Sequence, residues 1–114
     1  MNINGKEYKI EFDEKNNITM SGMLAAMPDE YEKIETFFEK IIEQSNKKEL
    51  ILDLRELSFL NSSGIKSICV ALLMEIDEIE GFHLKVLGST STTWQVETIP
   101  TFEDLIDNLE IVLE

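Results

Sequence analysis

The sequence predicts an α/β fold, a single domain in which a mixed β-sheet is flanked by helices. Three observations lead to this prediction. Short stretches that alternate apolar with charged residues, the period of a half-buried strand, occur near residues 10 and 84. Two longer stretches repeat apolar residues at helical spacing. Between them, residues 50–54 are apolar almost without a break, which is typical of a parallel strand covered by helices on both faces.

Length and charge limit the domain organisation and the partners. The 114 residues are expected to form one domain, 1–114, that is large enough to bury a proper core. Ten Lys and Arg against 23 Asp and Glu give a formal net charge of −13, which repels nucleic acid phosphates and anionic lipid headgroups. We therefore expect a protein partner with a basic face, no nucleic acid and no membrane.

The expected compartment is the cytoplasm. The single cysteine, Cys69, cannot form an internal disulfide. No basic segment followed by an apolar core opens the chain, and no apolar run approaches the length of a membrane span.

The N-terminal part is expected to form a β-hairpin. Residues 13–17 have the composition of a turn, and residues 23–27 form an apolar connection without a clear period. On either side of the turn, apolar residues alternate with polar ones at Tyr8, Ile10, Phe12, Ile18 and Met20.

A first helix is expected to begin at Pro28 and to end at residues 45–48. Proline is tolerated in the first helical turn, and Asp29 and Glu30 complement the helix dipole there. Its apolar stripe is Tyr31, Ile34, Phe37, Phe38, Ile41 and Ile42.

The second helix is expected to run from Ser62 to about Glu80. The run of small polar residues at 61–64 can accept hydrogen bonds from the free N–H groups of a helix start, and Gly81 can stop the helix. One face of this helix is apolar, at Ile65, Ile68, Cys69, Leu72, Leu73, Ile76 and Ile79. Val70 and Met74 lie on the opposite face, beside Lys66 and Ser67.

The C-terminal third is expected to add a strand, a short helix and a last strand. Phe82, Leu84 and Val86 alternate with polar residues, and residues 89–93 form a loop of small residues before Trp94. Thr101 with Asp104 makes a cap pair for a short helix. Residues 109–113 could extend that helix, but their β-branched side chains favour a strand.

No pattern in the sequence predicts catalysis, a cofactor or a metal site. The Gly-x-Ser-x-Gly elbow of serine hydrolases is absent, and His83 lies in an alternating strand, where we expect it to face solvent. The five glycines are scattered without a phosphate-loop spacing, and one His and one Cys cannot make a transition-metal site. We therefore expect a protein that is not an enzyme.

Asp53 ends the apolar strand, and we expect it to be structural. Its carboxylate can accept hydrogen bonds from the backbone N–H groups of a loop at residues 55–57. Gly64 is expected to be structural as well, and Cys69 to pack as a small hydrophobic residue.

Several of these residues together resemble a known family. Residues 50–54, the apolar Leu57, Phe59 and Leu60, and then Asn61-Ser62-Ser63-Gly64-Ile65 resemble the central motif of STAS domains, the fold of bacterial anti-sigma factor antagonists. The hairpin, the helix lengths and the total length agree with that family. The spelling Asn-Ser-Ser-Gly and the later pair Trp94-Gln95 are similar to those of short stand-alone STAS-like regulators.

The resemblance implies a signalling role in the regulation of transcription. In the better-known antagonists the site reads Asp-Ser-Ser-Gly, and a partner kinase phosphorylates its first serine, which matches Ser62. Asn61 replaces the aspartate here; it can cap a helix equally well, and the loss of charge eases placement of a phosphate. The implied partners are a serine kinase or anti-sigma factor and a PP2C-type phosphatase. Ser63 is the second choice for the modified residue.

The sequence leaves three interpretations open. The first is a non-catalytic switch that binds a protein partner through Asn61, Ser62, Ser63, Lys66, Val70 and Met74 and is switched by phosphorylation at Ser62. Against it, the serines could serve only as helix caps, and Val70 and Met74 could pack under the last helix. The second is a STAS-fold module that senses a small ligand, in a pocket under the 89–93 loop, or that scaffolds an assembly. A small enzyme comes third.

Overall fold

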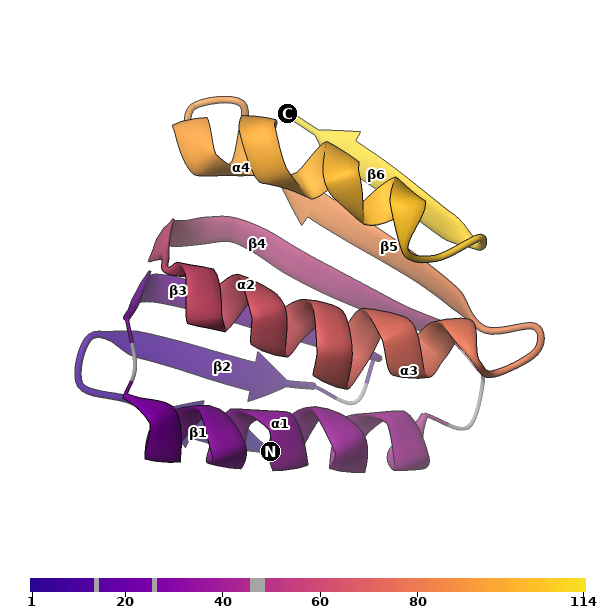
Figure 1. Ribbon diagram of the computed structural model, residues 1–114, viewed down its shortest axis with the longest axis horizontal. Coiled ribbons are helices and arrows are strands. Elements are labelled where there is room, and N and C mark those ends of the chain that lie inside the picture. Colours follow the sequence, from indigo (N-terminus) through magenta and orange to yellow (C-terminus); the bar gives the residue numbers. More distant parts are fainter. Residues whose placement is uncertain (14, 26, 46–48) are drawn as a thin grey trace.

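The computed structural model describes residues 1–13, 15–25, 27–45 and 49–114 and shows one six-stranded sheet with a layer of helices (Figure 1). The strands follow the chain in the order β1-β2-β3-β4-β5-β6. They are β1 (Asn2–Asn4), β2 (Tyr8–Phe12), β3 (Asn17–Leu24), β4 (Glu49–Leu60), β5 (His83–Gly88) and β6 (Leu109–Leu113). The helices are α1 (Pro28–Gln44), α2 (Ser62–Ile68), the π-helical η1 (Cys69–Leu73), α3 (Met74–Asp77), α4 (Thr93–Thr98) and the 3-10 helix η2 (Ile99–Asp104).

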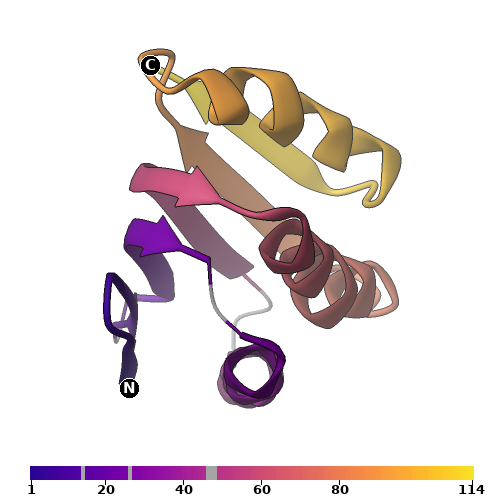
Figure 2. The same ribbon diagram turned by 60° about the vertical axis from the view of Figure 1, so that its left-hand side comes forward.

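The sheet is mixed, as the sequence predicts. Strands β1, β2 and β3 pair antiparallel, whereas β3, β4, β5 and β6 pair parallel. Each parallel connection passes through a helix. Because consecutive strands are neighbours and such crossovers are right-handed, all the connecting helices fall on one face of the sheet. Figures 1 and 2 show α1, the α2–α3 segment and α4 together on that face.

The prediction that helices cover both faces of the central strand is therefore wrong. In β4, Leu50, Leu52 and Leu54 are buried against the helices, whereas Ile51 and Asp53 lie half-buried on the other face. Single apolar residues are common on a partly exposed surface, so Ile51 is tolerated there without a covering helix.

The predicted hairpin is present and has a third strand that the sequence analysis missed. The Asp13 side chain accepts hydrogen bonds from the backbone N–H groups of Lys15 and Asn17, both at 2.9 Å, and Asn16 has a positive φ of 65°. This turn joins β2 to β3. Strand β1 adds to the outside of β2, and its three residues are too few to show a period.

Strand β3 is longer than predicted, because residues 23 and 24 belong to it rather than to the connection that follows. Met23 pairs with Phe59, and Leu24 pairs with Leu60. Gly22, at φ 88°, allows the shift of register just before Met23, since a Cβ there would lie 2.2 Å from the carbonyl oxygen of Glu7.

Helix α1 confirms the first helical stripe. Tyr31, Ile34, Phe37, Phe38 and Ile41 are buried, and Ile42 is half-buried. The helix ends at Gln44, and Ser45 donates from its hydroxyl to the carbonyl of Glu49, 3.1 Å away. Residues 46–48, where the sequence analysis placed the rest of the helix end, lie outside the described residues.

The second helix is one continuous segment at residues 62–77, called here the α2–α3 helix, and it ends before Glu80. Its middle, η1, is π-helical, and there three consecutive residues, Ala71, Leu72 and Leu73, are buried because the wider turn rotates the buried face. Gly81 does not end this helix. It has a φ of 78° and lies in the separate turn whose ends are Ile79 and Phe82.

Strand β4 continues through Leu60, so residues 55–57 are strand and not the predicted loop. The cause is pairing that the local sequence does not show: β3 also continues to Leu24 and supplies hydrogen-bond partners for this part of β4. Asn61 therefore follows the strand directly and begins the α2–α3 helix.

Near the C-terminus, the predicted last strand is confirmed and the predicted helix start is wrong. Strand β6 pairs parallel with β5. The helical segment begins at Thr93, ahead of Trp94, and continues through η2. Thr101 lies inside it, and its hydroxyl donates to the carbonyl of Thr98 at 2.6 Å instead of capping a helix start.

Candidate partner-binding site around Ser62

Asn61 connects the end of β4 to the α2–α3 helix and is the N-cap of that helix. Its backbone is extended, with φ −80° and ψ 171°, and its Oδ1 accepts from the N–H of Gly64 at 2.9 Å. The hydroxyl of Tyr31, from α1, donates to the same oxygen. The N–H of Asn61 donates to the carbonyl of Leu24 at 3.2 Å, which ties the cap to the end of β3.

Ser62 and Ser63 are the first two residues of the helix and are exposed to solvent. Neither is the cap, because Asn61 already accepts from the Gly64 N–H. In the described part of the chain, no side chain or backbone group bonds to either hydroxyl. The interpretation that these serines serve only as helix caps is therefore wrong, and both hydroxyls face solvent.

Gly64 is buried in the first turn of the helix. A Cβ at this position would lie 2.4 Å from Cδ1 of Leu60 and 3.2 Å from Oδ1 of Asn61. Because a side chain here would push on the cap itself, the site needs the small residue.

Lys66, Val70 and Met74 follow the serines along the outer side of the same helix. Val70 is 46% and Met74 49% exposed, and Lys66 is exposed as well. The alternative that Val70 and Met74 pack under the last helix is therefore wrong. Next to them, Ser67 is buried and donates to Oε1 of Glu35 on α1 at 3.2 Å.

The open face of the sheet and the outer surface of the helix layer differ in charge. Where the chain is described, the four ion pairs lie on the sheet or at the end of β6: Lys9–Glu11, Arg55–Asp53, Arg55–Glu114 and Lys85–Glu110. In the helix layer, α1 carries six carboxylates against two lysines, and the α2–α3 helix carries two against one lysine. The open sheet face is thus nearly balanced in charge, whereas the helix layer around Ser62 is acidic.

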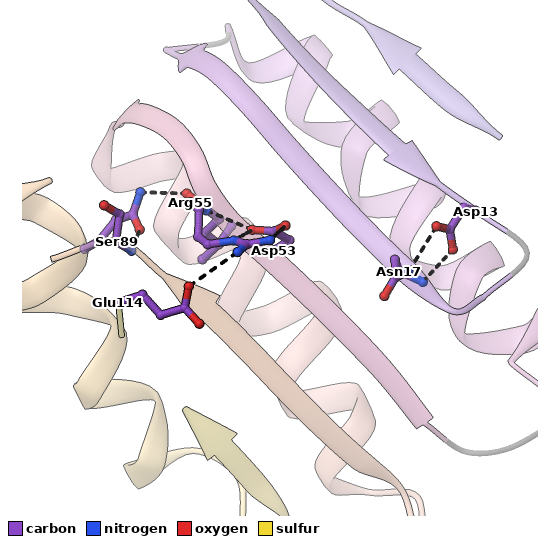
Figure 3. Close-up of polar contacts among 8 residues, drawn as sticks. Asp13, Asn17, Asp53, Arg55, Ser89 and Glu114 are labelled. Carbon is purple, nitrogen blue, oxygen red and sulfur yellow. Dashed lines mark hydrogen bonds and ion pairs between the residues drawn. The ribbon is translucent and has the colours of Figure 1, made fainter. Parts of the chain in front are cut away.

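Asp53 and Arg55 form a polar cluster on the open face (Figure 3). The Asp53 carboxylate accepts from Nε and Nη2 of Arg55 at 3.0 and 2.9 Å and from the Arg55 backbone N–H at 3.1 Å. The side-chain hydrogen bonds of Arg55 lower the pKa of Asp53 against the opposing effect of partial burial, and its backbone N–H and charge lower it further. Glu114 lies 3.6 Å from the guanidinium.

Gln95 is a key residue to which sequence reasoning assigned no role. It is 0% exposed, and its Nε2 donates to the carbonyls of Leu54 at 2.6 Å and Leu57 at 3.0 Å. Its Oε1 accepts from the N–H of Ser89 at 2.7 Å, and the neighbouring Trp94 donates to Leu57 at 2.9 Å. The pair Trp94-Gln95 was the available signal. The Gln95 side chain is thus buried next to the loop at residues 89–92, at the place where the small-ligand interpretation requires a pocket.

Comparison with known proteins adds evidence on the fold. No protein-family model and no curated protein matches the sequence. The crystal structure of apo-SiaC from Pseudomonas aeruginosa matches with a TM-score of 0.73 at 17% identity, over 100% of this chain and 97% of that chain. A chain in the crystal structure of diguanylate cyclase SiaD in complex with its activator SiaC, from the same organism, matches with a TM-score of 0.71 at 18% identity, over 100% and 99%. These likenesses show the fold.

The structure brings the predicted site residues together on one helix and places His83 far from them. Asn61 to Met74 follow the carboxyl end of β4, whereas His83 begins β5 and is exposed at the opposite edge of the parallel sheet. His83 is therefore not placed to act as a general base for Ser62. Burial raises the pKa of the half-buried Cys69 thiol, which disfavours the reactive thiolate.

Across residues 1–13, 15–25, 27–45 and 49–114, no group of three or more His, Cys, Asp or Glu side chains is arranged to hold a metal ion. None of the helices in these ranges is both long enough and apolar enough to span a bilayer.

Proposed function

We propose that this protein is a non-catalytic regulator that binds a protein partner through the loop and helix around Ser62, and that phosphorylation of Ser62 changes the affinity. The observation that carries the proposal is the arrangement on one helix of an exposed, unbonded hydroxyl and, farther along, the exposed apolar residues Val70 and Met74. A kinase can reach such a hydroxyl, and a partner that covers it also meets the apolar pair.

The likeness to SiaC supports a partner-binding role for the whole domain. The fold matches along the whole chain, both with apo-SiaC and with a chain of the complex between SiaD and its activator SiaC. SiaC is described as the activator of an enzyme. An enzyme is therefore a second class of partner for this protein, beside the serine kinase or anti-sigma factor that the STAS resemblance implies.

A phosphate at Ser62 is expected to act on binding rather than on folding. At the N-terminus of a helix, free N–H groups and the helix dipole stabilise added negative charge. Lys66, one turn along the same helix, is spaced to pair with it. A partner packed on this loop would instead have to desolvate the phosphate, at a cost of a few kcal/mol, or about a hundredfold in affinity.

Asn61 suits this switch. Its Oδ1 caps the helix and accepts from Tyr31 without bringing a second negative charge next to the phosphate. In the STAS resemblance a serine kinase adds the phosphate and a PP2C-type phosphatase removes it, and regulation of transcription is the process affected. These assignments belong to the same proposal.

The test is intact-mass spectrometry after incubation with ATP and a serine kinase of the class that the STAS resemblance implies, on wild type, Ser62→Ala and the matched control Ser63→Ala. We expect one added phosphate in wild type and in Ser63→Ala, and none in Ser62→Ala. Binding of the native partner should be lost in the phosphorylated wild type and kept by Ser62→Ala with or without kinase. A phosphate that persists in Ser62→Ala would place the switch elsewhere, with Ser63 first.

The small-ligand alternative has less support. It requires a pocket beneath the loop that follows β5, and there the Gln95 side chain bonds to Leu54, Leu57 and Ser89. A ligand at that place would have to displace a fully buried side chain and replace its three hydrogen bonds.

A further inference from the structure

We propose that the outer surface shared by α1 and the α2–α3 helix takes a basic amphipathic helix of the protein partner. This inference rests on the proposed partner-binding function, and it is independent of phosphorylation. We call this surface the helix face. It consists of Glu35, Glu39, Glu43, Ser63, Lys66, Val70 and Met74.

The two helices form one continuous surface. Figures 1 and 2 both show α1 and the α2–α3 helix side by side. The hydrogen bond from Ser67 to Glu35, at 3.2 Å, identifies the side of α1 that faces the other helix. Glu39 and Glu43 follow Glu35 at intervals of four residues, so they lie on that same side, one and two turns along.

The centre of the helix face is apolar. Val70 and Met74 are four residues apart and are each close to half exposed. Side chains at this spacing form a small row one turn long, the kind of anchor that an amphipathic helix contacts with its own apolar residues. Methionine adds an unbranched side chain that adapts to the shape of the partner.

The charge around this apolar row is mainly negative, since Glu35, Glu39 and Glu43 lie beside it on α1, and the exposed Lys66 stands one turn before Val70. Among the residues that the structure describes, the ion pairs lie on the strands and the C-terminal Glu114, and none involves Glu39 or Glu43. The whole chain carries a net charge of −13. A second copy of the chain, an anionic lipid surface or a nucleic acid would all be repelled, whereas a basic protein segment is attracted.

The secondary structure of the face favours a helix over an extended segment as the occupant. Within α1 and the α2–α3 helix the backbone N–H and C=O groups are bonded along the helix, so an added strand would find no edge to pair with. A helix with apolar residues at positions i and i+4 and Lys or Arg beside them presents both the apolar row and the cations that this face requires.

The test uses unphosphorylated protein and a synthetic probe. The probe is an amphipathic Leu/Lys peptide of about 18 residues, similar in length to the 17 residues of α1. A peptide with the same composition in scrambled order is its control. Binding is measured by fluorescence anisotropy at physiological salt, and the bound surface is mapped by ¹H–¹⁵N NMR shifts.

We expect the amphipathic peptide to bind about tenfold tighter than the scrambled one. Met74→Gln should weaken binding about tenfold, and Met23→Gln, which changes an equally exposed methionine on β3, should leave it unchanged. The double variant Glu39→Lys/Glu43→Lys should weaken binding by at least as much as Met74→Gln. Glu7→Lys/Glu56→Lys, which changes net charge equally but lies outside the helix layer, should not.

Equal binding of the two peptides would show attraction by net charge alone and overturn the inference. NMR shifts centred on the open sheet face would overturn it as well. The proposed function is tested separately, because loss of phosphorylation in Ser62→Ala does not affect the peptide measurement. If the peptide binds as expected but binding of the native partner does not depend on Ser62, the result supports this surface and contradicts the proposed phosphorylation switch.

Discussion

The hydroxyl of Tyr31 donates a hydrogen bond to Oδ1 of Asn61, thirty residues along the chain. One residue belongs to α1, and the other caps the α2–α3 helix directly before Ser62. The two helices that form the helix face are thus joined at the end where the proposed switch lies. The same Asn61 oxygen also serves the Gly64 N–H, so the position of the first helical turn depends on α1.

Tyr31→Phe is expected to destabilise the domain by about 1 kcal/mol, the value of a single hydrogen bond, because the phenyl ring keeps its packing. Urea unfolding measures the effect. Tyr8→Phe is the matched control. It also removes a hydrogen bond of a phenol hydroxyl, which Tyr8 donates to Glu30 at 3.0 Å, and Tyr8 is less buried than Tyr31. An equal or larger loss of stability in Tyr8→Phe would show that the hydrogen bond from Tyr31 to the cap contributes no more than a phenol hydrogen bond elsewhere in the protein.

Gln95→Glu is expected to cost about 3 kcal/mol or more. The new carboxylate is nearly isosteric, but it cannot donate to the carbonyls of Leu54 and Leu57, and it buries a charge where Gln95 is 0% exposed. Thermal unfolding followed by circular dichroism gives the result. Val96→Ala, at the exposed next position, should change the melting temperature little, and a similar melting temperature for Gln95→Glu would contradict the role assigned to its amide.

Met74→Glu is expected to keep the fold, with stability changed by no more than about 0.5 kcal/mol, because the side chain is half exposed. It should weaken a pull-down of the native partner. Leu73→Glu, the neighbouring residue at 0% exposure, should prevent folding or lower stability by more than about 4 kcal/mol. A large drop in the melting temperature of Met74→Glu would place Met74 in the core.

Phosphorylation of Ser62 is expected to leave the domain folded, with a melting temperature equal to or slightly above that of the unmodified protein. The added charge lies at a helix N-terminus, with Lys66 four residues away. Calorimetry measures the melting temperatures of phosphorylated and unmodified protein. The same comparison in Lys66→Gln shows how much of any stabilisation by the phosphate comes from the lysine. Unfolding on phosphorylation would exclude a switch that acts on binding alone.

The acid dependence of stability should report the Asp53–Arg55 pair. The folded-state pKa of Asp53 is lowered, so its contribution is fully present above the ordinary aspartate pKa of about 3.9 and is lost as pH falls through the lower folded value. Asp53→Asn should therefore differ most from wild type at pH 6 to 7 and approach it below about pH 4. Glu110→Gln, on the same face, is the control. A difference in stability between wild type and Asp53→Asn that grows as the pH falls would contradict this prediction.

Local patterns in the sequence determined most of the elements and the cap. The apolar stripe of α1 and the alternation in β2, β3 and β5 appear in the structure, because a side-chain period follows directly from the geometry of a helix or a strand. The small polar residues at 61–64 marked the start of the α2–α3 helix for the same local reason. Outward exposure of Val70 and Met74 also followed from helical spacing, although packing under another element was an open alternative.

Only the tertiary structure decided the features that depend on a distant partner. Strand β4 extends to Leu60 because β3 supplies backbone hydrogen bonds beside it, and Gln95 matters because two strand carbonyls lie within its reach. The donation from Tyr31 to Asn61, and the location of all the helices on one face, likewise arise from chain segments that meet only after folding. A hydrogen bond or a shared face between remote segments has no periodic trace in the local sequence, so the fold alone determines it.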